Sequence, residues 1–514
     1  MRWTHWIGGV GGACTAALIL AAHARGATAP DAACAKVAHF SIQNGSITLA
    51  EAVDAGALTV QGVSAATARA LPAFCRVAAT LTPSRDSDVR IELWLPASGW
   101  NGKLQAVGNG AFTGSIAYSA MATALPHGYA VGSTDTGHAG GSAGFGLGHP
   151  EKVVDFGWRS VHELTVAGKR LVAEYYDAPP KHSYWTGCSA GGRQALKEAQ
   201  RFPADYDGIV AGAPGLDWTG RAARAVQVAQ RLEKNPAARL SQADAQRLHR
   251  AVLDACDAAD GVKDGVIEDP ARCAFDPAAL QCPSTGAGQA PASCLSAAQV
   301  ETARLLYAPA VNPKTKREIT GLFRGSELGW TDLGWSASAR ATGLDQFRFL
   351  VFGDASWTID RFDFDRDIAR AEDADDDTIN ALDPNLKPFL DRGGKLIQYH
   401  GWSDPQISPG NSTQYFTRVA AALGGADRLA KGYRLFMVPG MAHCGGGEGP
   451  NSFDMVDALE NWVEHGRAPD RIVAKHVVNG AIERTRPLCP YPQVAVYSGA
   501  GSTNDAASFA CRAR

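Results

Sequence analysis

The sequence Gly187-Cys188-Ser189-Ala190-Gly191 lies between a strand-like run, residues 182–186, and a helical pattern over residues 192–202. It matches G-x-S-x-G, the pattern of a tight strand-to-helix turn that holds a serine in a strained conformation above the edge of a sheet. Small neighbours let such a turn close, and the helix N-terminus behind it favours developing negative charge. In this context the pattern predicts a nucleophilic Ser189, whereas the pentapeptide alone would more often be a glycine-rich turn.

Short apolar runs alternate with helical patterns on both sides of this turn. Two strand-like runs joined by a turn-rich segment predict a hairpin near the start, Arg76–Leu81 and Val89–Leu95. Four further predicted strands each end in a turn rich in small residues: Leu104–Val107, Tyr129–Gly132, His182–Thr186 and Asp207–Ala211. The predicted helices between them include Val161–Tyr176 and Gly192–Phe202. This alternation predicts a mostly parallel sheet with helices on both faces and a site at the carboxyl ends of the strands.

The alternation of strands and helices stops after Pro214. It resumes with predicted strands at Lys395–His400 and Tyr433–Val438 and a predicted helix at Met455–His465. The simplest architecture is one discontinuous α/β core interrupted by an inserted domain. The predicted division is a signal peptide over residues 1–27, the first part of the core over 28–215, the insert over 216–390 and the second part of the core over 391–514.

The resumed core supplies two partners for the serine. A serine hydroxyl needs a base to remove its proton, and the base needs an acidic group that fixes its tautomer. Asp404 and His443 each follow a predicted strand, and the order Ser, Asp, His is that of α/β-hydrolases. The sequence therefore predicts an α/β-hydrolase fold with Ser189, Asp404 and His443 as the catalytic triad. Asp404 could instead be a turn or cap residue before proline. His400 competes as the base, but it ends its strand directly before the acid, so we expect its ring to be structural.

Eleven cysteines and the N-terminus indicate where the chain resides. Basic residues precede an apolar stretch, Trp6–Ala22, which small residues follow, as in a secretory signal peptide. The apolar run is shorter than the ~20 residues that a membrane span needs, and no second run is long enough. Cleavage would remove Cys14 and leave an even set of ten cysteines, which predicts up to five disulfides in a secreted or periplasmic protein.

The charge balance limits the partners. There are 49 basic and 52 acidic residues, and no basic stretch clusters. A net charge of −3 lacks the long-range attraction that nucleic acid or an anionic membrane surface would need, so we expect neither as a partner of the mature chain. A small neutral or weakly acidic ligand is favoured. The sequence gives no oligomeric state.

Two cysteines adjoin the predicted triad, because Cys188 precedes Ser189 and Cys444 follows His443. If the serine and the histidine converge, their cysteines come close as well. A disulfide between them would join the nucleophile turn to the histidine loop.

Four segments closely resemble the tannase and feruloyl esterase family, which includes mono(2-hydroxyethyl) terephthalate hydrolase. They are Gly-Cys-Ser-Ala-Gly-Gly-Arg at 187–193, Phe-Pro-Ala-Asp-Tyr-Asp-Gly-Ile-Val-Ala-Gly-Ala-Pro at 202–214, Tyr-His-Gly-Trp-Ser-Asp-Pro at 399–405 and Pro-Gly-Met-Ala-His-Cys at 439–444. The resemblance implies a serine esterase that uses the triad above, with the insert as a lid over the site. Together with proximity in the chain it suggests five disulfides: Cys34–Cys75, Cys188–Cys444, Cys256–Cys273, Cys282–Cys294 and Cys489–Cys511.

The resemblance also implies a structural calcium ion in the lid and no organic cofactor. Residues 257–269 space carboxylates and glycines in a tight loop that suits a hard cation, though not with EF-hand spacing. From the residues alone, a solvated acidic turn is an equal alternative. By resemblance the ligands are the carboxylates of Asp257, Asp260 and Asp264 and the backbone oxygens of Val262 and Val266.

An oxyanion formed at Ser189 needs two backbone N–H donors. One should be Ala190, directly after the serine. The other should come from Gly108-Asn109-Gly110, which resembles the family's glycine-rich turn; we choose Gly110, with Gly108 and Asn109 as alternatives. These glycines could also simply end a strand.

By analogy with the family, the expected substrates are esters of small aromatic acids, cleaved through an acyl-enzyme. Feruloyl or chlorogenate-type esters come first, gallate esters second and aromatic diacid monoesters third; Arg340 or Arg348 facing a free carboxylate would favour the third. Five lid aromatics are candidates for contact with the substrate, although most lid aromatics are core: Trp330, Trp335, Phe347, Phe349 and Phe352. A remote alternative is a secreted binding protein that keeps this fold without turnover.

Overall fold

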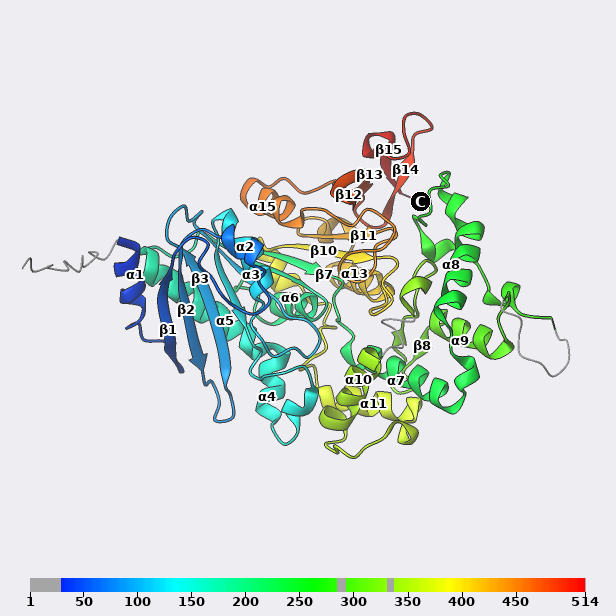
Figure 1. Ribbon diagram of the computed structural model, residues 1–514, viewed down its shortest axis with the longest axis horizontal. Coiled ribbons are helices and arrows are strands. Elements are labelled where there is room, and N and C mark those ends of the chain that lie inside the picture. The colour runs from blue at the N-terminus through cyan, green and yellow to red at the C-terminus, as the bar shows by residue number, and fades with distance from the viewer. Residues whose placement is uncertain (1–28, 284–292, 331–336, 514) are drawn as a thin grey trace, which may run out of the picture.

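A nine-stranded mixed sheet forms the centre of the molecule (Figure 1). The computed structural model describes residues 29–283, 293–330 and 337–513. The strand order is β1-β2-β3-β5-β4-β6-β7-β10-β11; β1, β2, β3 and β5 pair antiparallel, and the strands from β5 to β11 pair parallel. The strands are β1 (Gly45–Val53), β2 (Phe74–Leu81), β3 (Val89–Pro96), β4 (Lys103–Val107), β5 (Ala130–Thr134), β6 (His182–Cys188), β7 (Gly208–Gly212), β10 (Lys395–Gly401) and β11 (Tyr433–Val438).

Helices cover both faces of this sheet because each strand buries side chains on two sides. One core cluster includes Leu171 of α5 (Ser160–Tyr176), Leu196 of α6 (Ala190–Arg201) and Val419 of α13 (Gly410–Leu423). The other includes Met121 of α3 (Tyr118–Ala124) and Leu459 of α15 (Met455–His465). The α/β-hydrolase fold expected from the sequence is the one observed.

The predicted elements of the core are present with boundaries shifted by a few residues. Strand β1 was missed, because it is an edge strand whose exposed positions include Glu51, so its apolar signal is weak. Two small antiparallel sheets after α15 were also missed, β12 (Ile472–Val478) with β13 (Ala481–Leu488) and β14 (Gln493–Tyr497) with β15 (Phe509–Ala513).

The predicted insert, residues 216–390, contributes no strand to the large sheet in the described part of the chain. Its helices form a lobe beside the carboxyl ends of the parallel strands (Figure 1). We call this segment the lid; its boundaries stay predictions. Two clusters of buried residues form cores of its own. Its main helices are α7 (Trp218–Lys234), α8 (Gln242–Cys256), α9 (Ala297–Tyr307), α10 (Ala337–Asp345) and α11 (Phe364–Asp375).

Five disulfides are present, with the pairing that the family resemblance suggested. Such a set is typical of proteins that mature in an oxidising compartment. The predicted signal peptide, with Cys14, lies outside the described residues. Among the helices that the structure does describe, none combines the length and the apolar character that crossing a bilayer requires.

Candidate active site

Ser189 lies in the tight turn between β6 and α6. Its backbone has φ 64° and ψ −120°, a conformation that non-glycine residues rarely adopt. Two backbone bonds hold the turn, because the Ser189 N–H donates to Gly212 O over 3.0 Å and the Gly215 N–H donates to Ser189 O over 3.1 Å. The strained turn is thus fixed by the end of the neighbouring strand β7.

The glycines around Ser189 are required by close backbone contacts. A Cβ on Gly187 would lie 2.6 Å from the carbonyl carbon of Gly191, and one on Gly192 would lie 2.2 Å from the oxygen of Gly212. These distances are shorter than any real carbon contact. Gly187 and Gly192, which follows the pentapeptide, therefore let β6, α6 and β7 approach one another at the turn.

His443 follows β11 and contacts the acid predicted for it. Its Nδ1 lies 2.7 Å from Asp404 Oδ2, and its side chain is 10% exposed. A carboxylate only accepts, so Nδ1 carries the proton and Nε2 is left free to take one. Within the described residues, neither Ser189 Oγ nor His443 Nε2 has a hydrogen-bond partner, so both atoms are available for chemistry.

Asp404 is fully buried and has donors on both carboxylate oxygens. Oδ1 accepts from the backbone N–H groups of Gln406, at 2.8 Å, and Ile407, at 3.0 Å. Oδ2 accepts from His443 and also lies 3.2 Å from Nε2 of His400. Burial acts to raise the pKa of Asp404, but the charge of His443 and the hydrogen bonds from His400 and His443 outweigh burial and hold that pKa well below its usual range. Asp404 is therefore ionised at neutral pH.

The disulfide Cys188–Cys444 joins the residue before Ser189 to the residue after His443, with 6.0 Å between the two Cα atoms. Cys444, like Ser189, has a left-handed backbone, with φ 62°. Strained residues persist where surrounding structure holds them, and the disulfide is one such restraint. The serine and histidine loops are thus covalently fixed relative to each other.

Hydrogen bonds in the loop after β4 distinguish the three candidates for the second oxyanion donor. The Gly108 N–H donates to Thr186 O over 3.0 Å, and the Asn109 N–H donates to Gln194 Oε1 over 3.1 Å. In the part of the chain that the structure describes, the N–H groups of Gly110 and Ala190 have no acceptor. Of the three, only Gly110 therefore keeps its N–H free, as Ala190 does.

The predicted lid aromatics fall into different environments. Trp330 and Phe347 are 0% exposed, each inside a core of the lid, and Phe352 packs against the same core as Phe347. A fully enclosed ring cannot touch a substrate, so we correct the expectation for Trp330 and Phe347 to a structural role. Phe349 is the exception, because it packs against a cluster that contains Ala190. Trp335 lies outside the described residues.

Of the two arginines proposed to face a free carboxylate, the structure describes the side chain of Arg348. Arg348 donates from Nε to the carbonyl of Trp357, at 2.8 Å, within the lid. The side chain of Arg340 lies outside the described part. The structure therefore offers no support from these two arginines for a diacid monoester.

Sequence reasoning missed an aromatic cluster next to Ala190. It contains Phe112, Phe145, Phe156 and Trp218, with ring centroids 5.0 to 6.2 Å apart in contacting pairs. The one available signal was position, because Phe112 follows the glycine-rich turn and Trp218 follows Pro214 closely.

Arg193 joins this aromatic cluster to the helix behind Ser189. It is fully buried, donates to the carbonyls of Phe156, Gly157 and Ile379, and stacks over Phe156 and Trp218. Burial lowers the pKa of Arg193 to about 10. The arginine of the Gly-Cys-Ser-Ala-Gly-Gly-Arg motif therefore joins the lid, through Ile379, to helix α6, which begins directly after Ser189.

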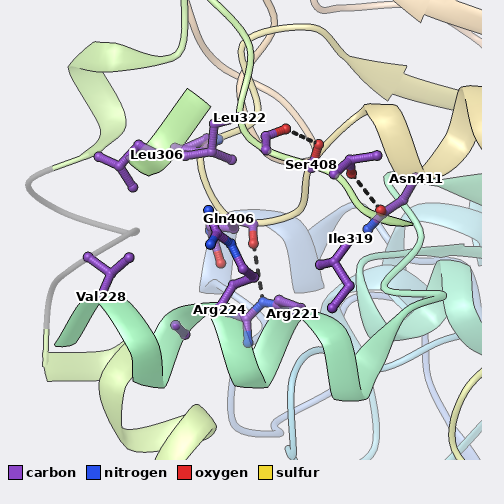
Figure 2. A pocket seen from close by; sticks show the side chains of 13 residues that line it. Arg221, Arg224, Val228, Leu306, Ile319, Leu322, Gln406, Ser408 and Asn411 are labelled. Atoms are coloured by element: carbon purple, nitrogen blue, oxygen red, sulfur yellow. Dashed lines mark hydrogen bonds between the residues drawn. The ribbon is translucent and has the colours of Figure 1, made fainter. Parts of the chain in front are cut away.

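The lid also holds the loop that carries Asp404. Arg221 of α7 donates from Nε to the carbonyl of Gln406, a bond drawn in Figure 2, and the distance is 3.2 Å. The hydroxyl of Thr320 donates to Asn411 Oδ1 over 2.6 Å. These residues line a cavity of about 70 Å³ between α7 and the segment 405–411. None of the three triad residues lines this cavity, so it belongs to the contact between lid and core.

A second contact joins the lid to the histidine loop. His249 of α8 is buried, and its Nδ1 and Nε2 lie 2.8 Å from Glu327 and 2.6 Å from Glu448. Glu327 is also in the lid, whereas Glu448 lies five residues after His443. Burial acts to lower the pKa of His249, but the hydrogen bonds and charges of the two glutamates raise it to about 9. His249 is therefore a charged link between lid and site.

The acidic loop predicted to bind calcium folds around Asp257, whose carboxylate accepts from the N–H groups of Asp264 and Gly265. Asp260 accepts from the N–H of Val262, and Asp264 accepts from that of Val266. The other oxygen of Asp264 pairs with Arg486 of β13. Nowhere in the described residues do three acidic, histidine or cysteine side chains gather as a metal site. These hydrogen bonds and this ion pair leave the calcium assignment, which includes the backbone oxygens of Val262 and Val266, a prediction.

Comparisons with known proteins identify the family to which the chain belongs. A profile of the family described as "Tannase and feruloyl esterase" matches residues 75–512. An uncharacterised esterase of Xanthomonas campestris pv. campestris is 37% identical, over 93% of this chain and 91% of that protein. Mono(2-hydroxyethyl) terephthalate hydrolase of Piscinibacter sakaiensis is 36% identical, over 87% of this chain and 86% of that protein.

A solved structure extends the likeness to three dimensions. Feruloyl esterase B from Aspergillus oryzae superposes with a TM-score of 0.87 at 30% identity, covering 93% of this chain and all of that one. The match includes both parts of the core and the lid between them. The chain therefore belongs to the tannase and feruloyl esterase family of carboxylic ester hydrolases.

Proposed function

We propose that the chain is a secreted serine esterase that cleaves esters of small aromatic acids, with Ser189 as nucleophile, His443 as base and Asp404 as acid. The observation that carries this proposal is the 2.7 Å contact between His443 Nδ1 and Asp404 Oδ2, on a loop that a disulfide ties to the residue before Ser189. The contact leaves Nε2 of His443 to act on the serine hydroxyl.

The proposed reaction has two steps. Ser189 Oγ attacks the ester carbonyl while His443 Nε2 takes its proton, and the N–H groups of Ala190 and Gly110 stabilise the oxyanion. His443 then gives the proton to the departing alcohol, which leaves an acyl-enzyme. Water attacks the acyl group with His443 again as the base, and the acid is released. Asp404 stabilises the charged His443 in both steps.

Feruloyl or chlorogenate-type esters are the first proposed substrates, gallate esters the second and aromatic diacid monoesters the third. The family description names tannase and feruloyl esterase, and one relative is a terephthalate monoester hydrolase. Phe145 and Phe349, the two partly buried rings packed against the cluster that contains Ala190, supply faces against which an aromatic acyl group could pack. The placement of Arg348 within the lid weighs against the third class.

Two further proposals concern the mature chain. The N-terminal signal pattern and five disulfides support export to the periplasm or beyond. The residue types of the loop 257–266 and the family resemblance support a structural calcium ion in this loop.

Trapping with a fluorophosphonate tests the catalytic assignment. We expect one covalent adduct at Ser189 under native conditions, and none after Ser189→Ala. A folded wild-type chain that stays unlabelled would instead support the binding protein without turnover. Hydrolysis rates for methyl ferulate, methyl gallate and a terephthalate monoester, measured side by side, then decide the substrate class.

A further inference from the structure

A second histidine contacts the carboxylate that binds His443. His400 is the residue before the last one of strand β10, is 0% exposed, and its Nε2 lies 3.2 Å from Asp404 Oδ2. This is the same oxygen that accepts from His443 Nδ1 at 2.7 Å. The proposed acid is therefore shared by one histidine that reaches the site and one that is enclosed behind it.

The partners of His400 determine its tautomer. Its Nε2 lies near two acceptors, Asp404 Oδ2 and the carbonyl oxygen of Ile407 at 3.1 Å, so this nitrogen must carry a proton. Its Nδ1 lies 2.6 Å from Ser412 Oγ. Ser412 accepts from the side-chain amide of Gln398 over 2.6 Å, which leaves its own proton to be donated to Nδ1.

The far end of this chain of hydrogen bonds is also fixed. Tyr433 donates to Gln398 Oε1 over 2.5 Å, which orients the amide so that its nitrogen faces Ser412. Tyr433, Gln398, Ser412 and His400 are all buried. Every bond then points in one direction, toward Asp404, and each group has a single arrangement that satisfies its neighbours.

We infer that His400 is a positioning residue for the proposed esterase reaction: as a neutral Nε2–H donor, locked by Ser412 and Gln398, it holds Asp404 Oδ2 in the place where His443 Nδ1 meets it. This inference rests on the proposed function, since it assigns His400 a role only through Asp404 and His443. His400 does not touch the substrate. Its effect is therefore on the orientation of the triad, and a triad displaced by about 1 Å can lose about 10²-fold in rate.

Other charged groups around Asp404 define the electrostatic background. His443 faces it from the loop after β11, and the guanidinium of Arg221 acts on it from α7 of the lid. Arg221 does not replace the hydrogen bond from His400 to Asp404, because Arg221 donates to the carbonyl of Gln406 and to Thr342. The backbone donors of Gln406 and Ile407 serve Oδ1, which leaves the two histidines as the donors to Oδ2 in the described residues.

Two polar substitutions separate positioning from folding. In His400→Gln the side-chain amide extends to the place of Nε2 and can still donate to Asp404. In His400→Asn the amide ends near the place of Nδ1, where it can bond Ser412 but cannot reach Asp404. We expect His400→Asn to lose about 10–100-fold in kcat with KM unchanged, and His400→Gln to restore most of that loss. The acid limb of the kcat/KM profile should also move to higher pH in His400→Asn only, because the carboxylate has lost a donor.

Tyr415→Phe is the matched control. Tyr415 is buried on the same helix as Ser412 and donates to the carbonyl of Asp383, away from the triad. This variant should lower the melting temperature without changing kcat. Equal activity and equal pH profiles for wild type, His400→Asn and His400→Gln would overturn the positioning role, as would equal losses in both His400 variants. Failure of the proposed function is recognised separately, because wild-type Ser189 would then not react with a fluorophosphonate. If His400→Asn does not fold, the comparison of His400→Gln with His400→Leu gives the same decision.

Discussion

At the scale of single residues, hydrogen bonds rather than proximity determine what each side chain in the site can do. Asp404 accepts from two backbone N–H groups and two histidines, so its orientation and charge are both fixed. Hydrogen bonding also distinguishes Gly110 from Asn109 as oxyanion donors, because the N–H of Asn109 already donates to Gln194 Oε1. A residue's role here follows from which of its polar atoms remain free.

Asp404→Asn tests this reasoning at the acid. The amide keeps an oxygen for the backbone donors of Gln406 and Ile407, but it presents N–H to His443 instead of an acceptor. His443 should then adopt the other tautomer, with its proton on Nε2, and kcat should fall by about 10⁴-fold, as in other serine hydrolases. Steady-state kinetics with methyl ferulate and an unchanged circular dichroism spectrum check the result. A loss below tenfold in the folded variant would mean that Asp404 is not the acid.

At the scale of elements, the site is assembled from loops that the lid and one disulfide hold together. Cys188–Cys444 fixes the serine turn to the histidine loop, and His249 links α8 of the lid to Glu448 on that same loop. The segment 325–329 of the lid also lies against the acid loop, since a Cβ on Gly329 would be 2.4 Å from Pro405. The catalytic loops therefore depend on packing outside the sheet.

Replacing Cys188 and Cys444 together by alanine should reduce both stability and turnover. A disulfide that closes a long loop typically stabilises by about 2–4 kcal/mol, and release of the histidine loop should lower kcat by about 10–100-fold. The matched control is the double alanine variant of Cys489 and Cys511, which pack in a cluster that contains no triad residue and should lose stability only. Calorimetry and steady-state kinetics separate the two effects. Full activity in the Cys188/Cys444 variant would show that packing alone aligns the loops.

The pKa of His249 predicts a loss of stability in mild alkali. This pKa is raised from 6.5 to about 9 in the folded chain, so the protonated form favours folding. The stabilisation is complete below about pH 6.5 and is lost as the pH rises through about 9. His249→Gln, which keeps hydrogen bonding without the charge, should be less stable than wild type at pH 6 by about 2 kcal/mol and nearly equal to it at pH 10. Denaturant unfolding of both proteins across this range measures the difference, and a gap that stays constant with pH would contradict the prediction.

At the scale of the whole molecule, the sequence predicted the core well and the lid poorly. The parallel strands carry apolar runs that end in small-residue turns, and the proposed triad residues Ser189, Asp404 and His443 lie at those ends. The lid has no such alternation of strands and turns, so the sequence could not separate its core aromatics from those near the site. Trp330 lies in a core of the lid, whereas Phe349 packs against the cluster that contains Ala190. His400 shows the same limit, because its contact with Asp404 depends on a turn that brings the two side chains together.

The predicted calcium ion would bind in the acidic loop of the lid, which contacts the two C-terminal sheets. The acidic loop contacts β13 through Asp264 and Arg486, and Glu268 accepts from the N–H of Ala495 in β14. If calcium binds, addition of excess Ca²⁺ after exhaustive chelation should raise the melting temperature. At a free Ca²⁺ concentration of 1,000 times the Kd, the folded state should gain about 4 kcal/mol in stability. Asp257→Asn should abolish the shift, whereas Asp276→Asn, on an exposed pair with Arg304, should not. A melting curve that does not respond to chelation or to Ca²⁺ would leave Asp264 as the partner of Arg486 alone.

The disulfide between Cys188 and Cys444 also has a topological consequence. The two cysteines are 256 residues apart, and the whole lid lies between them in the chain. Asp404 lies inside this covalent loop as well, and His443 is its last residue before the closing cysteine. A protease that cuts anywhere in the lid would therefore produce two fragments that migrate as one band until a reductant is added. The nicked enzyme would keep its nucleophile and its base on a single covalent body, so cleavage of the lid need not separate the catalytic groups.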